Sequence, residues 1–182
     1  DREELYRWIE YYKIKFKSRV YTPLNNSEKY TLVLMGRADF GLLGSYNKYK
    51  QTPFETFHVG GDGMTGSYTY ATETIGLRGY GNGALTPYSD GRAYTRFSME
   101  LHFPFLLQPS STIYGLAFVE GGNAWTSLEN FNPFSLKRSA GVGVRIFLPM
   151  IGLMGIDWAY GFDKVQGEKG GGHFHFILGQ EF

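Results

Sequence analysis

Two stretches of the sequence carry residue types whose spacing is typical of ligand or metal sites. Residues 61–66 read Gly-Asp-Gly-Met-Thr-Gly and match the G-x-G-x-x-G pattern of dinucleotide-binding loops. The chain that follows is rich in Tyr, Thr and Gly and does not predict the helix that such a site needs. His173 and His175 share one face of a predicted strand, but no third metal ligand is apparent. No Ser/His/Asp set has supporting context, so we expect no enzyme, nucleotide cofactor or metal site.

The composition narrows the class of protein. The chain has 182 residues, with 18 Lys+Arg against 17 Asp+Glu, and a net charge of +1 argues against nucleic acid as a partner. The absence of cysteine excludes a disulfide framework and a thiolate metal site. With 25 Gly, 14 Tyr and 15 Phe, the composition is typical of strands and turns. No run of 18 apolar residues exists, so the sequence predicts no transmembrane helix.

Strict alternation of apolar and polar residues is the dominant pattern. In residues 11–21, Lys13, Lys15, Lys17 and Arg19 fall on one face, with period 2. A soluble sheet could show this pattern, and so could a membrane barrel with lipid outside and a wet lumen inside. The same alternation predicts six more strands, over residues 30–43, 93–105, 113–121, 140–147, 153–161 and 173–182. We also expect Arg145 and Asp157, on neighbouring strands, to form a structural pair.

The connections between the predicted strands alternate in length. Short connections fall at residues 22–29, 105–112 and 149–152, and long ones at 46–92, 125–137 and 163–172. A transmembrane barrel shows this asymmetry, with tight periplasmic turns and longer external loops, whereas a sandwich has no reason to. We therefore predict an all-β fold, a transmembrane antiparallel β-barrel.

The number of strands predicts that the barrel is incomplete. Bacterial single-chain barrels have an even number of strands and must close, because lipid cannot satisfy a bare strand edge. About seven antiparallel strands cannot close such a barrel. We expect the chain to be a piece, cut in an external loop, whose remaining strands lie elsewhere.

The end of the chain has a pattern of its own. Phe174, Phe176, Leu178 and Phe182 lie on one face of the last predicted strand, which resembles the C-terminal β-signal by which barrel proteins reach their assembly machine. The alternative is an ordinary amphipathic strand. Gly179 weakens this strand, because an interior glycine loses packing and permits a kink.

The longest connection carries the most specific motif, Leu77-Arg78-Gly79-Tyr80. It resembles the Arg-Gly-aromatic tip of the sixth external loop in the BamA superfamily of outer-membrane insertases, a loop that folds back into its own lumen. The resemblance covers nearly the whole chain in the right order. It implies that residues 1–182 are the C-terminal half of a sixteen-strand type of outer-membrane barrel, with 46–92 as that loop. Its further matches are residues 60–63, 98–100, 118–125, 139–144 and the final strand.

The resemblance also implies partners for the loop arginine. The family's partner acids match Glu100 and Glu120, and a guanidinium in a partly buried lumen can hold two carboxylates. The alternation places Glu100 on the inward face, whereas Glu120 shares a face with Leu116 and Phe118. The family usually has Asp at the Glu120 position. The competing interpretation is that Arg78 is a solvated loop residue.

The function implied by the resemblance is non-enzymatic insertion of other barrel proteins into the Gram-negative outer membrane. The final strand would form one side of a lateral seam, and its free backbone groups would accept an incoming strand. The implied partners are the remaining barrel strands, periplasmic POTRA domains, assembly-complex lipoproteins, unfolded client proteins and the lipid bilayer. The alternatives are a related polypeptide-secretion or autotransporter-assembly barrel, a passive porin, and a small soluble β-sandwich that binds lipid.

Overall fold

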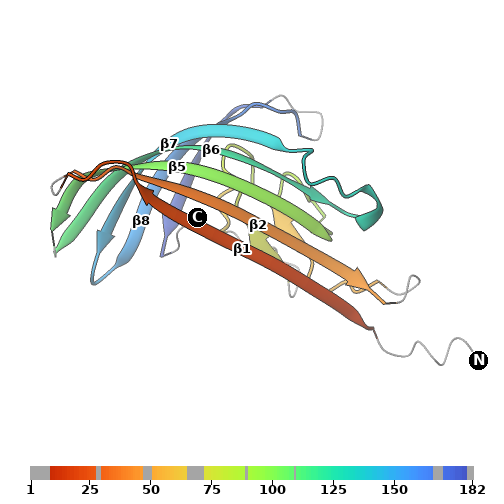
Figure 1. The fold of residues 1–182 in the computed structure, drawn as a ribbon. Coiled ribbons are helices and arrows are strands. Elements are labelled where there is room, and N and C mark those ends of the chain that lie inside the picture. Colours follow the sequence, from red (N-terminus) through yellow and green to blue (C-terminus); the bar gives the residue numbers. More distant parts are fainter. Residues whose placement is uncertain are drawn as a thin grey trace, which may run out of the picture.

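The protein forms one curved antiparallel sheet of seven long strands, shown in Figure 1. The structure is a computed structural model that describes residues 9–27, 30–46, 51–64, 72–88, 90–108, 110–165 and 170–179. All seven predicted strands are present and the predicted all-β fold is confirmed. In sheet order they are β1 (Tyr11–Pro23), β2 (Val33–Ser45), β5 (Ala93–Gln108), β6 (Ser111–Trp125), β7 (Lys137–Leu148), β8 (Gly152–Gly161) and β9 (Gly172–Leu178).

Shorter elements lie in the long connections. β3 (Phe57–Val59) and β4 (Glu73–Ile75) form a separate parallel pair between β2 and β5, and the 3-10 helix η2 (Leu128–Asn130) follows β6. The sequence analysis did not predict β3 or β4, because three residues are too few to show alternation. Within the described residues, no helix is long and apolar enough to cross a bilayer.

The connections follow the predicted asymmetry. At one end of the sheet, β5 joins β6 through residues 109–110 and β7 joins β8 through residues 149–151. At the other end, the connections span residues 46–92, 126–136 and 162–171. The antiparallel order places all the long connections at one end, as in a transmembrane barrel.

The two faces of the sheet have opposite chemistry. We call the face that contacts residues 51–92 the inner face, and the opposite one the outer face. On β8 the outer-face Trp158 is 43% exposed, whereas the inner-face Asp157 is fully buried. Apolar side chains outside and charged side chains inside reverse the pattern of a soluble sheet, and this is the arrangement of a barrel wall between lipid and lumen.

The described residues of the segment 51–92, which are 51–64, 72–88 and 90–92, lie in the hollow of the curved sheet (Figure 1). Apolar side chains join it to the inner face through one buried cluster. Because this cluster anchors β3, β4 and the turn that follows them, it fixes where the tip of the segment lies. The cluster contains Leu43, Phe57, Val59, Ile75, Leu77, Tyr80 and Tyr94.

The sheet is open, and β1 and β9 are its two edges within the described residues. An open sheet of seven strands fits the expectation of part of a larger barrel. One expectation for β9 is corrected. β9 ends at Leu178, and Gly179 follows it with φ +72° instead of lying in the strand interior, because a left-handed residue cannot continue an extended strand.

Candidate functional site

The tip of the segment 51–92, which we call the inner segment, is residues 77–80. Backbone pairing with the strand on the other side of the segment fixes where the tip begins. β3 and β4 pair in register, with Val59 opposite Ile75, and the pairing continues as a bridge between Gly61 and Leu77. The two amides of this bridge donate across it at 3.2 and 3.1 Å. Leu77 itself is fully buried in the apolar cluster. The next residue, Arg78, therefore leaves a rigid base and points at the sheet.

Arg78 is fully buried and donates to three carboxylates. Its Nη2 donates to Glu120 Oε1 at 2.6 Å and also to Glu100, and its Nη1 donates to Asp157 Oδ2 at 3.0 Å. The backbone amide of Arg78 donates to Glu120 Oε2 at 3.0 Å. Burial alone would lower the pKa of Arg78, but the carboxylates of Glu120, Glu100 and Asp157 outweigh it and raise that pKa above its usual value.

The guanidinium of Arg78 also stacks on an aromatic ring. Its central carbon lies 3.5 Å from the ring centroid of Phe118, a buried residue of β6. A planar guanidinium can use its edge for carboxylates and its face for a ring at the same time, which an ammonium cannot do. The site is therefore specific for arginine rather than for positive charge alone.

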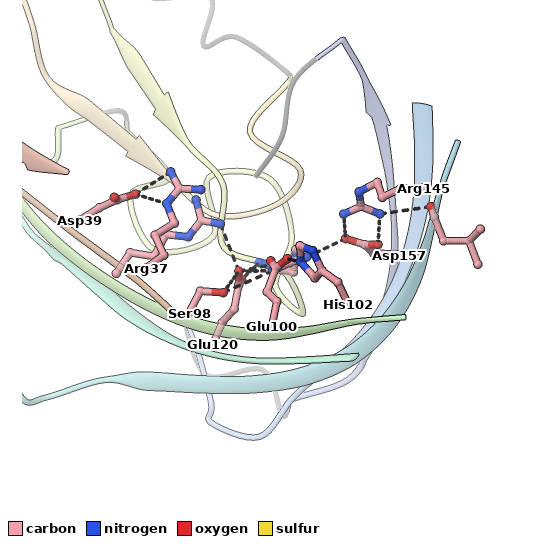
Figure 2. Close-up of polar contacts among 11 residues, drawn as sticks. Arg37, Asp39, Ser98, Glu100, His102, Glu120, Arg145 and Asp157 are labelled. Atoms are coloured by element: carbon pink, nitrogen blue, oxygen red, sulfur yellow. Dashed lines mark hydrogen bonds and ion pairs between the residues drawn. The ribbon is translucent and has the colours of Figure 1, made fainter. Parts of the chain in front are cut away.

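Each carboxylate also has a partner within the sheet itself (Figure 2). Glu120 accepts from Arg96 Nη2 at 3.1 Å, and Glu100 contacts His102 Nε2 at 2.8 Å. Arg145 binds both oxygens of Asp157, which confirms the predicted Arg145–Asp157 pair. Arg78 thus joins a wall network in which its acids are already paired, so no carboxylate depends on the loop alone.

Two glycines make room for the pair formed by Arg145 and Asp157. Gly143 lies directly opposite Asp157, and Gly155 directly opposite Arg145, in the register of β7 and β8. A Cβ on Gly143 would meet Asp157 Oδ1 at 1.7 Å, and a Cβ on Gly155 would meet Arg145 Nη1 at 2.7 Å. The two side chains therefore lie across the neighbouring strand, where Asp157 reaches Arg78 of the loop tip.

The next two residues of the tip bind the far strands. The Gly79 amide donates to Nε2 of His175 on β9 at 2.9 Å, so this nitrogen is an acceptor. The Tyr80 hydroxyl donates to the carbonyl of Arg138 on β7 at 2.6 Å, and burial raises the pKa of Tyr80 to about 12. Residues 78–80 together contact β5, β6, β7, β8 and β9.

The other flank of the segment binds the first strand. Glu73 of β4 forms ion pairs with Lys13 at 3.1 Å and with Lys15 at 3.1 Å, and Glu55 binds Lys13 at 2.8 Å. Burial would raise the pKa of Glu73, but the hydrogen bonds from Lys13 and Lys15 lower it below its usual value. The inner segment therefore crosses the sheet from edge to edge.

A comparison with known families places this architecture. The model of the Omp85 superfamily domain matches residues 3–182. The chain belongs to the Omp85 superfamily. As an Omp85 protein it is a non-enzymatic β-barrel protein of the outer membrane.

A solved structure matches the same fold. The crystal structure of BamA from Haemophilus ducreyi lacking POTRA domains 1-3 is similar with a TM-score of 0.66 and 21% identity. The match covers 92% of this chain and 35% of that chain. This Omp85 chain therefore spans about a third of the solved structure, and its open sheet corresponds to part of that barrel.

Sequence reasoning named much of the Omp85 site but not all of it. The structure brings Leu77, Arg78, Gly79 and Tyr80 against the inner face, with Arg78 between Glu100 and Glu120. The sequence did not predict that Arg78 shares Asp157 with Arg145, or that Phe118 lies beneath the guanidinium. It also did not predict that His175 accepts a hydrogen bond from Gly79. The alternation did place Phe118 on the same face as Glu120. It could not show that the loop tip contacts β6, β8 and β9 together, because that depends on the curvature of the sheet.

The remaining expected residues lie away from this site. Phe174, Phe176 and Leu178 face outward on β9, each more than half exposed, and Gly179 follows them. Phe182 lies outside the described residues. Among the residues that the structure describes, no group of three or more His, Cys, Asp or Glu could hold a metal ion.

Proposed function

We propose that this chain is the C-terminal half of the barrel of an outer-membrane insertase, which assembles other β-barrel proteins through a lateral seam beside β9. The observation that carries the proposal is the burial of Arg78 among Glu100, Glu120 and Asp157. This contact ties residues 46–92, which we assign as an external loop folded into the lumen, to the wall. A passive pore has no need of a fully buried arginine that fixes a loop to its wall.

The loop braces the wall on both sides of the open sheet. It binds β1 through Glu73 and reaches β9 through the contact between Gly79 and His175. β9 is an edge strand within the described residues. The backbone N–H and C=O groups on its side away from β8 are therefore available to another strand. We propose that the loop holds the curvature of the wall while β9 pairs and separates at the seam.

The proposal implies further components. The other side of the seam is a strand of the remaining barrel, and POTRA domains lie upstream in the periplasm. Lipoprotein partners of the assembly complex dock mainly on those domains, and unfolded outer-membrane proteins are the clients. The outward apolar face of the wall contacts the lipid bilayer.

A disulfide lock of the seam tests the proposal. The full-length protein, reconstituted with its partners in vesicles, receives one cysteine in β9 and one in the strand that closes the barrel against it. The present chain has no cysteine, so in this part of the protein only the introduced residue can be cross-linked. We expect oxidation to stop the insertion of a client barrel, measured by its protease resistance, and reduction to restore it.

The matched control is a second disulfide away from the seam. Val144 and Ile156 lie directly opposite each other on β7 and β8, so cysteines there can also be cross-linked. Insertion must continue when this second pair is oxidised. Unimpaired insertion with the seam locked would contradict the proposal, and a client that crosses the membrane instead of entering it would indicate the related secretion barrels.

A further inference from the structure

A large apolar groove lies on the outer face over β5, β6 and β7. Its volume is about 660 Å³, and its outward side chains include Phe97, Met99, Val119, Leu136 and Phe162. The outer face of an outer-membrane barrel contacts lipid, so this groove lies in a lipid environment. It is formed by strands from the middle of the sheet, and neither edge strand lines it.

A glycine lines the groove. Gly121 lies between Phe97 on β5 and Arg138 on β7 in the sheet register, so two large side chains flank a position with none. A Cβ on Gly121 would meet Leu136 Cδ1 at 3.3 Å. Leu136 therefore packs against Gly121, and the groove runs beside this contact, next to Phe97, Val119 and Phe162.

A single arginine lies at the end of the groove toward the long connections. The side chain of Arg138 is 70% exposed and binds Asp163 through Nε at 3.1 Å and Nη2 at 3.0 Å. This arrangement leaves N–H groups of the guanidinium for an additional acceptor. A guanidinium that still has N–H donors, beside an apolar groove on a lipid-facing surface, is complementary to a lipid with an acyl chain and a phosphate headgroup.

We propose that this groove is a specific binding site for one membrane lipid with an anionic phosphate headgroup. An acyl chain lies along the groove beside Leu136, against Phe97, Val119 and Phe162, and the headgroup phosphate accepts from Arg138. This site lies away from the seam, on the opposite face of the sheet from the loop tip, whose Tyr80 hydroxyl donates to the backbone carbonyl of Arg138. It does not depend on insertase activity. Its place near the long connections puts it in the outer leaflet if those connections are external.

The test measures lipids retained by the full-length protein. The protein is extracted from nanodiscs of phosphatidylcholine that contain either phosphatidylglycerol or diacylglycerol with the same acyl chains, and bound lipids are counted by native mass spectrometry. We expect one retained phosphatidylglycerol. In the Gly121→Leu variant the new side chain displaces that of Leu136 into the groove, which should abolish retention, whereas Gly36→Leu, on the same face with open space around it, should not.

Two charge variants separate headgroup binding from a structural role. Arg138→Gln should lower phosphatidylglycerol retention about fivefold, since one basic group near a membrane surface contributes about that factor. Asp163→Asn should raise it, because the guanidinium then has no competing carboxylate. Neither variant should change the retention of diacylglycerol.

Several outcomes would overturn the proposal. Equal retention in Gly121→Leu and Gly36→Leu would mean ordinary exchangeable lipid, and parallel losses in both charge variants would mean a structural ion pair. Val119→Phe fills the groove by a second route, so the test does not depend on the folding of Gly121→Leu. Folding of every variant is checked by its resistance to unfolding in dodecyl sulfate without heating.

Discussion

Gly79 lies directly against Ser139 of β7: a Cβ on Gly79 would meet the Ser139 Cβ at 2.7 Å. Gly79 also has φ +87°, a conformation in which an L side chain is strained. Its neighbour two residues on, Gly81, has no heavy atom within 4 Å of a built Cβ. Only one of these glycines is therefore required by space and by backbone conformation.

We predict that Gly79→Ala destabilises the docked loop by about 1–3 kcal/mol, because strain and close contact act together. Gly81→Ala should change stability by less than about 0.5 kcal/mol. Urea unfolding of the two full-length variants in lipid vesicles measures the difference. Equal stabilities would mean that the tip does not pack against β7 as closely as the structure indicates.

A second prediction concerns the loop arginine. Arg78→Ala should cost about 3 kcal/mol, at the low end for breaking a buried ion pair, because Glu120 and Asp157 keep Arg96 and Arg145. Arg78→Lys should recover only part of this loss, since an ammonium cannot stack on a ring and bind carboxylates at its edge together. The same unfolding measurement checks both. Full stability of the lysine variant would show that charge alone is sufficient.

The exposed Arg138 provides the control for the unfolding measurement on Arg78→Ala. Its ion pair with Asp163 lies at the surface, and such pairs contribute little to stability. Arg138→Ala should therefore leave the unfolding midpoint nearly unchanged. A loss as large as that of Arg78→Ala would point to a general effect of removing arginines from this protein.

The contact between Gly79 and His175 predicts a local effect at β9. In His175→Phe the Gly79 amide loses its acceptor, and an unpaired buried donor costs about 1–3 kcal/mol. The Gly79 amide should then exchange with deuterium faster, as measured by mass spectrometry of loop peptides. His173→Phe, two residues earlier on the same strand, should leave this exchange rate unchanged.

The pH dependence of stability should include a contribution from Glu73. Its pKa in the folded protein is lowered below the usual 4.5, so the folded state favours the charged form. This contribution is fully present above pH 4.5 and is lost as the pH falls through the lowered folded pKa. Glu73→Gln should remove that part of the acid destabilisation between neutral and acidic pH. An unchanged pH profile would mean that Lys13 and Lys15 do not hold Glu73 in solution.

The alternation of residue types predicted the sheet well because each strand separates lipid from lumen. Lys13, Glu100 and Asp157 each lie on the face that period 2 assigns to them, and the strand bounds differ from the predicted ones by only a few residues. Alternation contains no information about curvature, so it could not reveal that Asp157 on β8 and Glu100 on β5 meet at one guanidinium. The short strands β3 and β4 were missed for a related reason, since the fold of the loop depends on its contacts with the wall.

The charge count of the wall has a consequence for biogenesis. Arg96 and Arg145 face three carboxylates, Glu100, Glu120 and Asp157, so among these five groups the wall has one negative charge in excess. Both pairs form between residues of the sheet and do not wait for the loop. The wall can therefore form these pairs without the loop, and Arg78 supplies the one positive charge that balances the five groups. We expect strand pairing to tolerate the loss of Arg78 and docking of the loop not to.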